Sequence, residues 1–255
     1  MRRKIILVPL ILIILRFEII NFKAFGYEET GNTGIEKKNS VVFLTFDDGP
    51  SYTNTLKILD ILKNYNVNAT FFVVGNNAGI YPEIIKQMKE CRMAICPHCY
   101  NHNYRVVYES EEAYSSDLNK CIEVVGRIIG NINSNFIRLP GGSLNSICNT
   151  NILSKIKINL LQNNISYVDW NVNAGDAASA QVNKDAILSN IYNGGDYYRI
   201  AVVLLHDAES KTTTVEALPL IIEYYKSRGY IFKSFDEMTK DEYEYLINAK
   251  VINKK

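Results

Sequence analysis

The sequence predicts an α/β domain in which strands and helices alternate along the chain. From about residue 40 onward, short apolar runs rich in β-branched and aromatic residues alternate with longer amphipathic stretches. Such alternation is typical of repeated strand and helix units around a mostly parallel sheet. The chain has 255 residues, 47% of them hydrophobic, which matches the length that one β/α barrel commonly occupies. We therefore expect a single folded domain.

Seven segments are expected to be strands because each is a short apolar run with β-branched or aromatic residues. In chain order they are residues 41–46, 69–74, 93–95, 136–138, 165–170, 200–205 and 230–232. Apolar residues at helical spacing fill the intervals between them. Leu56, Leu59 and Leu62 fall on one helical face. This pattern predicts a helix over residues 53–65, and a similar pattern predicts one over residues 112–129.

The first 26 residues differ from the rest of the chain. A basic start is followed by an unbroken apolar run over residues 5–15, which is the layout of a signal peptide. The run is shorter than the roughly 20 apolar residues that span a membrane, and Arg16, Glu18 and Lys23 interrupt its extension. We interpret residues 1–26 as a signal peptide, with an uncleaved N-terminal anchor as the alternative. We therefore expect a secreted, cell-surface or cell-wall-associated protein.

The remaining boundaries follow from changes in polarity. Residues 27–40 are polar, contain glycine and have no hydrophobic period, so they predict a linker. The folded domain is expected over residues 41–240, followed by a polar C-terminal tail over residues 241–255.

The charge balance argues against one class of partner. The chain carries 28 Lys and Arg residues against 27 Asp and Glu residues, a formal net charge of +1. This balance is too even to suggest a nucleic-acid partner. Contact with a membrane is expected only through an uncleaved N-terminal anchor.

The cysteines do not define a disulfide framework. An oxidising compartment would pair them, but their number is odd and one would be left over. Free thiols are an equally open interpretation. The five positions are Cys91, Cys96, Cys99, Cys121 and Cys148.

Polar residues that can do chemistry follow five of the predicted strands. They are Asp47 and Asp48, His98 and His102, Arg138, Asp169 with Trp170, and His206 with Asp207. In parallel α/β barrels the active site is built at the carboxyl ends of the strands, from residues far apart in sequence. The agreement of five separate placements therefore predicts an active site.

Two of the three histidines point to a metal. His98 and His102 are four residues apart, so one helical turn or a tight loop can aim both rings at one point. Zinc sites with an open position often use two histidines and a carboxylate, and the bound water then has a pKa of about 7. The pair Asp47 and Asp48 can supply the third ligand and a general base. A surface histidine pair and a simple Asp-Asp turn before Gly-Pro remain open alternatives.

The order of these clusters resembles a known family. The clusters are Thr45-Phe46-Asp47-Asp48-Gly49-Pro50-Ser51, His98 to His102, Arg138-Leu139-Pro140-Gly141-Gly142, Asp169-Trp170, and Leu204-Leu205-His206-Asp207. Together they resemble the five ordered motifs of the polysaccharide deacetylases of carbohydrate esterase family 4. That group includes peptidoglycan N-acetylglucosamine deacetylases and chitin deacetylases. The resemblance runs over about residues 41–235, and the ordered combination is far more specific than any single motif.

The resemblance implies a role for each residue on the metal side of the site. Asp48, His98 and His102 would hold a divalent transition metal, usually zinc. Asp47 would be the general base for water attack on the acetyl carbonyl. Arg138 would match the arginine that orients and charges the base carboxylate.

The resemblance also implies the remaining roles. The backbone amide of Gly141 would help to stabilise the oxyanion. His206 would match the general acid that protonates the departing amine. Asp169 would hold that imidazole in position. Trp170 and Leu204 would wall the pocket that receives the acetyl methyl group.

The segment before the first metal histidine departs from the family pattern. Family members commonly show Glu-Ile-Gly-Asn before this histidine and Ser or Thr after it, whereas Cys96, Pro97 and Cys99 stand here. The C-x-x-C spelling also permits a redox motif of the thioredoxin-like kind, and oxidation of these thiols could disturb the metal site. Asp176, which lies near the expected cleft, is interpreted as a loop or capping residue.

Taken together, the sequence predicts a secreted or surface-tethered metal-dependent deacetylase with a distorted seven-stranded β/α barrel. Its expected substrate is an N-acetylated polysaccharide, with peptidoglycan N-acetylglucosamine preferred. Chitin oligomers, a surface polysaccharide and N-acetylmuramic acid remain open. A catalytically lapsed carbohydrate-binding wall protein is the alternative of another class.

Overall fold

The computed structural model describes residues 40–132 and 135–254, which fall within one unit of the chain. The signal or anchor expected over residues 1–26 and nearly all of the linker expected over residues 27–40 lie outside the described residues. Within the described part, no helix combines the length and the apolar character that crossing a membrane requires.

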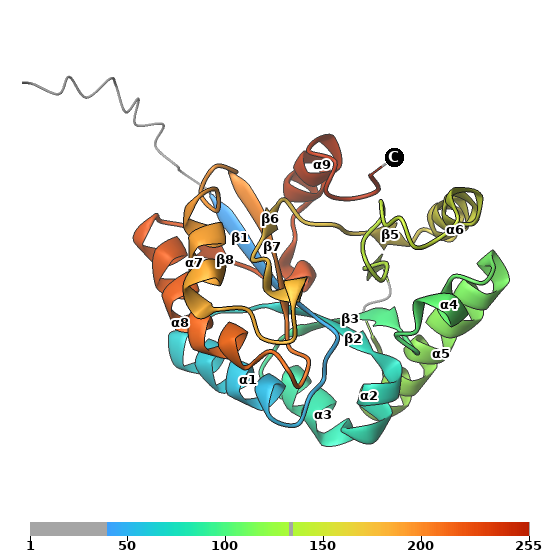
Figure 1. The fold of residues 1–255 in the computed structure, drawn as a ribbon, viewed down its shortest axis with the longest axis horizontal. Helices are drawn as coiled ribbons and strands as arrows, with labels where there is room; N and C mark the ends of the chain where they lie inside the picture. Colours follow the sequence, from blue (N-terminus) through green and yellow to red (C-terminus); the bar gives the residue numbers. More distant parts are fainter. Residues whose placement is uncertain (1–39, 133–134, 255) are drawn as a thin grey trace, which may run out of the picture. The chain divides into compact units, whose positions relative to one another are not determined.

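A parallel sheet of six strands forms the centre of the domain (Figure 1). Its hydrogen-bonded order is β3 (Ala94–Cys99), β2 (Thr70–Val74), β1 (Val41–Asp47), β7 (Ile200–His206) and β6 (Val172–Asn173), with β8 (Ile231–Phe232) also paired to β1. A separate parallel pair is formed by β4 (Phe136–Ile137) and β5 (Ser166–Tyr167). In the register of β1 and β7, Asp47 lies opposite His206. The two longest strands therefore end side by side.

The α/β class with a parallel sheet is confirmed, and each of the seven predicted strand segments overlaps an observed strand. The strands are divided between two sheets, and β6 is an additional strand of two residues. The third strand also extends beyond its predicted end to Cys99, so that His98 lies on a strand and not in a loop. Pro97 is tolerated there because β3 is the last strand of its hydrogen-bonded path, where a missing N–H is least costly.

Nine helices of the described residues surround the sheets. They are α1 (Asn54–Tyr65), α2 (Gly75–Ile80), α3 (Pro82–Glu90), α4 (Tyr104–Val107), α5 (Glu111–Ile129), α6 (Thr150–Gln162), α7 (Lys184–Tyr192), α8 (Thr212–Ser227) and α9 (Lys240–Asn248), with 3-10 turns η1 (Asp176–Ala178) and η2 (Phe235–Glu237). The two helices predicted from apolar spacing are α1 and α5. Local sequence fixes the start of α5, because the Ser110 hydroxyl accepts a hydrogen bond from the Ala113 N–H at 3.1 Å.

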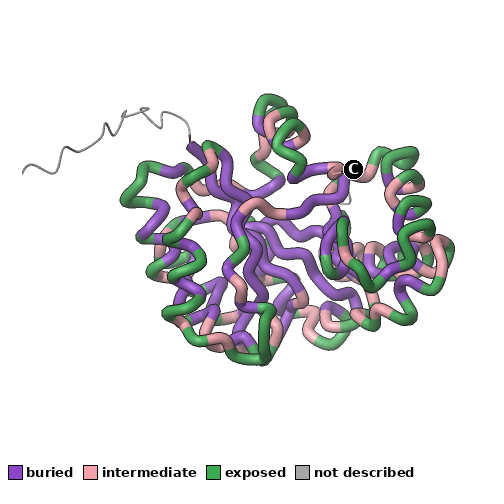
Figure 2. Tube along the Cα trace, turned by 45° about the horizontal axis from the view of Figure 1, so that its top comes forward, coloured by how far each residue is buried: buried purple, intermediate pink, exposed green. Residues whose placement is uncertain are grey.

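The alternation of side chains along β1 divides the core into two parts. Val42, Leu44 and Phe46 pack in a cluster with residues of α1, α3, α5, α7 and α8. Val41 and Phe43 point to the opposite face and pack in a second cluster. Thr45 and Asp47 continue that second face, so the interior changes from apolar to polar toward the end of the strand. Figure 2 shows the buried strands at the centre and the exposed outer turns of the helices.

The C-terminal segment is not the polar tail expected over residues 241–255. It forms α9 and then packs into the second core cluster, where Leu246, Val251 and Ile252 are buried. Ile252 pairs with Val168 in an isolated antiparallel bridge. Leu246 is the buried apolar residue of α9, a helix capped by Thr239, whereas Val251 and Ile252 follow the helix. The folded domain therefore extends to residue 254.

Candidate active site

Side chains from the carboxyl ends of β1, β3 and β7 line one cavity of about 360 Å³. Its lining residues are Asp47, Asp48, His98, His102, Tyr104, Gly141, Gly142, Trp170, Asn173, Ala177, Leu204, His206 and Lys211. Eight of these are residues that the sequence singles out, and they come from distant parts of the chain. The parallel sheet therefore brings the predicted motifs together at one edge.

Asp48, His98 and His102 face one another on one side of the cavity. Oδ1 of Asp48 lies 3.5 Å from Nε2 of His98 and 3.1 Å from Nε2 of His102. One ligand atom from each residue lies within 4.8 Å of the other two. Two histidines and one carboxylate form a common ligand set for zinc. These residues therefore fit a divalent cation.

The surroundings prepare these three side chains for a cation. The Nδ1 atom of buried His98 lies 2.7 Å from the backbone oxygen of Arg138, which leaves Nε2 directed at the other two residues. Burial raises the pKa of Asp48, but hydrogen bonds and charges from the two histidines outweigh it and hold the pKa well below its usual range. Asp48 is therefore ionised at neutral pH.

The backbone at Asp48 is held in an uncommon conformation by its neighbours. Asp48 has a backbone φ of 77°, in the left-handed region that residues other than glycine rarely adopt. The next residue, Gly49, packs against the Asp207 carboxylate so closely that a Cβ atom would lie 2.1 Å from Oδ2. The Thr55 hydroxyl donates a hydrogen bond to that same oxygen at 2.5 Å. Asp207, which follows His206, therefore supports the turn that presents Asp48.

Asp47 points to the other side of β1 and pairs with Arg138. Nη1 of Arg138 donates to Oδ1 of Asp47 at 2.8 Å and to the Thr45 hydroxyl at 2.7 Å. The guanidinium is fully buried and lies 4.3 Å above the Phe72 ring. Its remaining donors reach the backbone oxygens of Val168 and Asp169, both at 3.1 Å. A buried cation with this many partners holds the carboxylate in one orientation.

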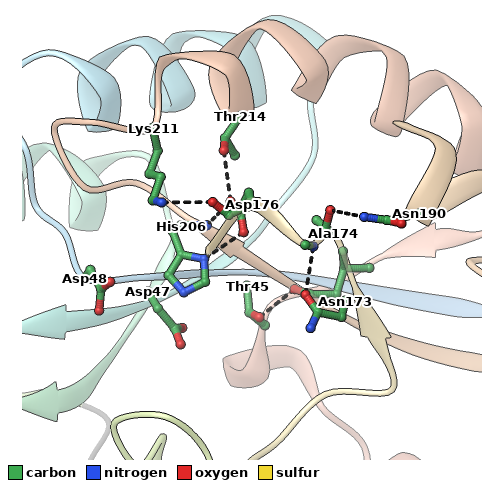
Figure 3. Close-up of polar contacts among 12 residues, drawn as sticks. Thr45, Asp47, Asp48, Asn173, Ala174, Asp176, Asn190, His206, Lys211 and Thr214 are labelled. Carbon is green, nitrogen blue, oxygen red and sulfur yellow. Dashed lines mark hydrogen bonds and ion pairs between the residues drawn. The ribbon is translucent and has the colours of Figure 1, made fainter. Parts of the chain in front are cut away.

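His206 is oriented by Asp176 on the far side of the cavity (Figure 3). Nδ1 of His206 lies 2.8 Å from Oδ1 of Asp176, and the His206 backbone N–H donates to Oδ2 at 2.8 Å. The Thr214 hydroxyl donates to the same Oδ2 at 2.9 Å. Burial lowers the pKa of His206, but the hydrogen bond and charge of Asp176, with the charges of Asp47 and Asp48, raise it to about 9. His206 is therefore a cation at neutral pH with Nε2 free to donate a proton.

This arrangement corrects the role that the resemblance implies for Asp169. The Asp169 carboxylate does not hold His206; it accepts hydrogen bonds from the Ser143 N–H at 2.8 Å and the Ser143 hydroxyl at 2.6 Å. The residue interpreted as a loop or capping position, Asp176, holds the imidazole instead. Asp169 follows β5, which belongs to the separate two-stranded sheet, whereas Asp176 follows β6, the direct neighbour of β7. β6 has only one apolar residue, Val172, followed by a polar one, so it gives almost no sequence signal, and the only hint is an acid placed soon after Val172.

The wall of the cavity contains the three residues expected to face the acetyl group. Gly141 has a φ of 75°, and its backbone N–H has no hydrogen-bond acceptor among the described residues, so it is available to a ligand. Trp170 packs within 3.0 Å of the position that a Cβ of Gly142 would take. Leu204 is buried at the end of β7. The arrangement combines a free donor with an apolar surface.

Asp117 on α5 is a supporting residue that the sequence does not reveal. Its carboxylate accepts hydrogen bonds from the backbone N–H groups of Tyr100 at 2.6 Å and Asn101 at 3.0 Å. These two residues form the turn between His98 and His102. The turn is therefore fixed from a helix, in a chain where Cys99 offers only a thiol in place of the hydroxyl usual in the family.

Cys96 and Cys99, the two cysteines of the C-x-x-C sequence, do not form a redox motif. Cys96 and Cys99 lie within β3 and not at a helix N-terminus, and both are buried. Burial raises the pKa of both thiols well above the usual range. All five cysteines are unpaired, and the cluster that fits a cation contains none of them. Because reactivity requires the thiolate, this environment argues against the redox interpretation.

Comparisons with known proteins agree with this geometry. A family model described as polysaccharide deacetylase matches residues 34–159. The chain is 33% identical over 199 residues to a peptidoglycan-N-acetylglucosamine deacetylase of Bacillus cereus, which covers 77% of this chain and 67% of that protein. It is 32% identical over 212 residues to a bifunctional xylanase/deacetylase of Pseudobutyrivibrio xylanivorans, which covers 81% of this chain and 32% of that protein. The chain thus spans about a third of the length of the second relative.

A solved structure has the same architecture. The catalytic domain of a peptidoglycan N-acetylglucosamine deacetylase from Eubacterium rectale superimposes with a TM-score of 0.72 at 32% sequence identity. The match covers 79% of this chain and 90% of that chain. The similarity therefore includes both the sequence and the fold.

Proposed function

Because this chain belongs to the polysaccharide deacetylase family, carbohydrate esterase family 4, we propose that it is a metal-dependent hydrolase of N-acetylated amino sugars in a polysaccharide. Our preferred substrate is N-acetylglucosamine in peptidoglycan. Two of the similar proteins are named as deacetylases of this substrate. One observation carries the proposal: a cation-binding triplet, an arginine-paired carboxylate and an aspartate-paired histidine open into a single cavity. We further propose that the protein acts outside the cell, secreted or at the cell surface.

The proposed reaction cleaves the bond between the acetyl carbon and the sugar nitrogen. Asp48, His98 and His102 would hold the divalent cation, with zinc preferred. That cation supplies Lewis-acid polarisation of the acetyl carbonyl and a lower pKa for bound water. Asp47 accepts a proton from the attacking water as the new bond from oxygen to the acetyl carbon forms. Arg138 holds Asp47 in the orientation that this step needs.

The second half of the reaction needs a donor and an acid. The Gly141 N–H donates to the negative oxygen that develops on the acetyl carbon. His206 then gives its Nε2 proton to the sugar nitrogen as the bond from carbon to nitrogen breaks, and Asp176 stabilises the charged imidazole. The products are acetate and a free amino group on the sugar. Trp170 and Leu204 would surround the methyl group during these steps.

The test is acetate release by the full chain from purified peptidoglycan and from N-acetylglucosamine oligomers. The protein is first chelated and then reloaded with zinc. We expect release that depends on zinc and that falls by about 10²- to 10⁴-fold in Asp47→Asn, the range for loss of a general base. Zinc content should remain unchanged in this variant, because Asp47 is not among the ligands.

The same experiment discriminates the alternatives. Release from N-acetylglucosamine oligomers but not from peptidoglycan would favour a chitin-oligosaccharide deacetylase. Stoichiometric zinc with no release from either substrate would mean that the substrate is wrong. A protein that neither binds zinc nor releases acetate would instead be a lapsed carbohydrate-binding protein, and the proposal would fail.

A further inference from the structure

Lys211 is a buried cation on the wall of the catalytic cavity, and the proposed reaction does not use it. It immediately precedes α8, is 8% exposed and lines the cavity together with Asp48 and His206. Lysine is almost never buried to this degree without a partner for its charge. The partners of its ammonium group therefore indicate what it does.

Both hydrogen bonds of the Lys211 ammonium go to neutral acceptors. Nζ donates to the backbone oxygen of Asp176 at 2.9 Å and to that of Ser179 at 2.6 Å. Figure 3 shows the first of these contacts beside the ring of His206. An ammonium group has three donors, so one remains. Within the described part of the chain, Lys211 forms no ion pair with a carboxylate.

The carboxylates around the cavity are not available to Lys211, because each already has another partner. The pairs are Asp47 with Arg138, Asp48 with the two histidines of the cation site, and Asp176 with His206. Leaving a buried charge without a counter-ion is costly. The unpaired charge of Lys211 lies on the wall of the cavity in which the substrate would bind. A negative charge on the substrate would offset the cost of burying it.

We propose that Lys211 binds a carboxylate of the substrate and that it makes the enzyme prefer acidic glycans to neutral ones. The inference rests on the proposed function and narrows its substrate class. Peptidoglycan offers such a carboxylate in one of two places: on the peptide attached to a muramic acid residue, or on the lactyl group of that residue where the peptide has been removed. Oligomers of N-acetylglucosamine offer none. A charged hydrogen bond of this kind is roughly twice as strong as a neutral one.

A positioning role for Lys211 makes a different prediction. Its two hydrogen bonds also tie the segment from Asp176 to Ser179 to the start of α8. If this tie were its whole role, loss of Lys211 would misplace Asp176 and slow every substrate equally. Thr214→Val is the matched control, because it removes a hydrogen bond to Asp176 without removing a charge.

The experiment measures kcat/KM for acetate release from three substrates by the zinc-loaded full chain. The substrates are N-acetylglucosamine oligomers, peptidoglycan strands that keep their peptides, and strands whose peptides an amidase has removed to free the lactyl carboxylates. Wild type, Lys211→Met, Lys211→Arg and Thr214→Val are compared. We expect Lys211→Met to lose about ten- to a hundredfold more on carboxylate-bearing strands than on oligomers, the range for hydrogen bonds to charged groups. Lys211→Arg keeps the charge and should retain most of the preference.

Each outcome either supports or overturns the proposed role of Lys211. A selective loss on stripped strands assigns the carboxylate to the lactyl group, and a selective loss on peptide-bearing strands assigns it to the peptide. An equal loss on all three substrates, as expected for Thr214→Val, overturns the proposal. Wild-type protein that is active without preferring carboxylate-bearing strands overturns it as well, while the proposed function stands. Zinc-loaded wild-type protein that is inactive on every substrate removes the proposed substrate and this inference with it.

One further measurement needs no variant. Conversion of the strand carboxylates to neutral amides should lower the wild-type kcat/KM toward the value for oligomers. Unchanged kcat/KM on the amidated strands would contradict the role of Lys211 even if Lys211→Met failed to fold.

Discussion

The two sides of the catalytic cavity are held in place by different means. The metal side, which we define as Asp48, His98 and His102, sits at or just after the ends of β1 and β3. Backbone pairing through β2 fixes those strands, and the side chains of Asp207 and Asp117 hold only the short turns that follow them. The proton side, which we define as His206, Asp176, Thr214 and Lys211, depends on side-chain hydrogen bonds. These bonds join β7, the turn after β6 and the start of α8.

This difference predicts how many neighbouring side chains a substitution should displace. A strand end keeps its place when one side chain is lost, because the backbone ladder remains. The turn at Asp176 follows a strand of only two residues, so its position depends on the hydrogen bonds from Thr214 and Lys211. We therefore expect sharp, local effects on the metal side and graded, shared effects on the proton side.

The largest effect should come from the metal side. Asp48→Ala removes the carboxylate that lies within 3.5 Å of both histidines. We expect loss of stoichiometric zinc and a fall of acetate release to the level of the chelated wild type, because two histidines alone are half of a zinc site. Metal analysis after dialysis and an acetate assay measure both. Full zinc content in Asp48→Ala would mean that other residues hold the cation.

Replacing each of the two candidate aspartates in turn tests which of them orients His206. Asp176→Asn removes the charge beside His206, and we expect kcat to fall by about 10²- to 10⁴-fold, since the imidazole loses its orientation and its charged form. Asp169→Asn alters only the contact with Ser143. We expect it to cost much less activity. Steady-state kinetics on the same glycan decide the assignment, which would be reversed if Asp169→Asn were the more damaging variant.

The pH dependence of activity should report the same pair. The acid form of His206 persists up to its pKa of about 9. We therefore expect kcat/KM to decline above about pH 9, and the decline to move to lower pH in Asp176→Asn, where burial is no longer opposed by that charge. An alkaline limb that stays at the same pH in Asp176→Asn would show that another group is titrating.

The same pair should make stability depend on pH. The folded pKa of His206 lies above the ordinary histidine value of about 6.5, so charging it stabilises the folded protein. That contribution is complete below about pH 6.5 and is lost as the pH rises through about 9. Thermal melts of wild type and Asp176→Asn across this window measure the loss, and parallel melting curves at every pH would contradict it.

The smallest effect concerns the stability contributed by Asp207, whose carboxylate packs against Gly49 in the turn after Asp48. Burial, with the charges of Asp48 and Asp47, raises the pKa of Asp207 to about 7. Its folded pKa is above the unfolded value of about 3.9, so its contribution to stability is complete below about pH 4 and is lost as the pH rises through about 7. In metal-free protein at pH of about 8, Asp207→Asn should raise Tm by a few degrees. Near pH of about 4 the two proteins should melt alike.

Much of the fold follows from local patterns in the sequence. Continuous apolar runs rich in β-branched and aromatic residues identify β1, β2 and β7, and each of these strands has five or more residues. β6 was not found because its one apolar residue, Val172, is flanked by Asn171 and Asn173, whereas the equally short β4, β5 and β8 lie within longer apolar runs. The packing of α9 was missed for a different reason. Buried Leu246, Val251 and Ile252 meet the core only through contacts with distant residues such as Val168.

The site divides in the same way. Asp47, Asp48, His98 and His206 end or directly follow long strands, and His102 is four residues from His98. Arg138 follows a short strand but opens a recognisable Arg-Leu-Pro-Gly-Gly motif. The structure brings all six residues to one cavity or directly beside it. Asp176 is 30 residues from His206, and no spacing links the two. Lys211 and Asp117 were also missed, because each acts on the backbone of another segment. Such contacts follow from the fold and leave no pattern in the chain.

The bridge between Val168 and Ile252 has a consequence for the order of folding. Asp169 and Trp170 follow Val168 directly, and the Asp169 N–H donates to the backbone oxygen of Val251 at 2.8 Å. On a ribosome, residues 251 and 252 are synthesised long after the strands that carry the cation site. A nascent chain that ends before them could pair β1 with β2 but would leave the wall around Trp170 without its support. The wall around Trp170 is therefore completed only once residues 251 and 252 can pair with Val168 and Asp169.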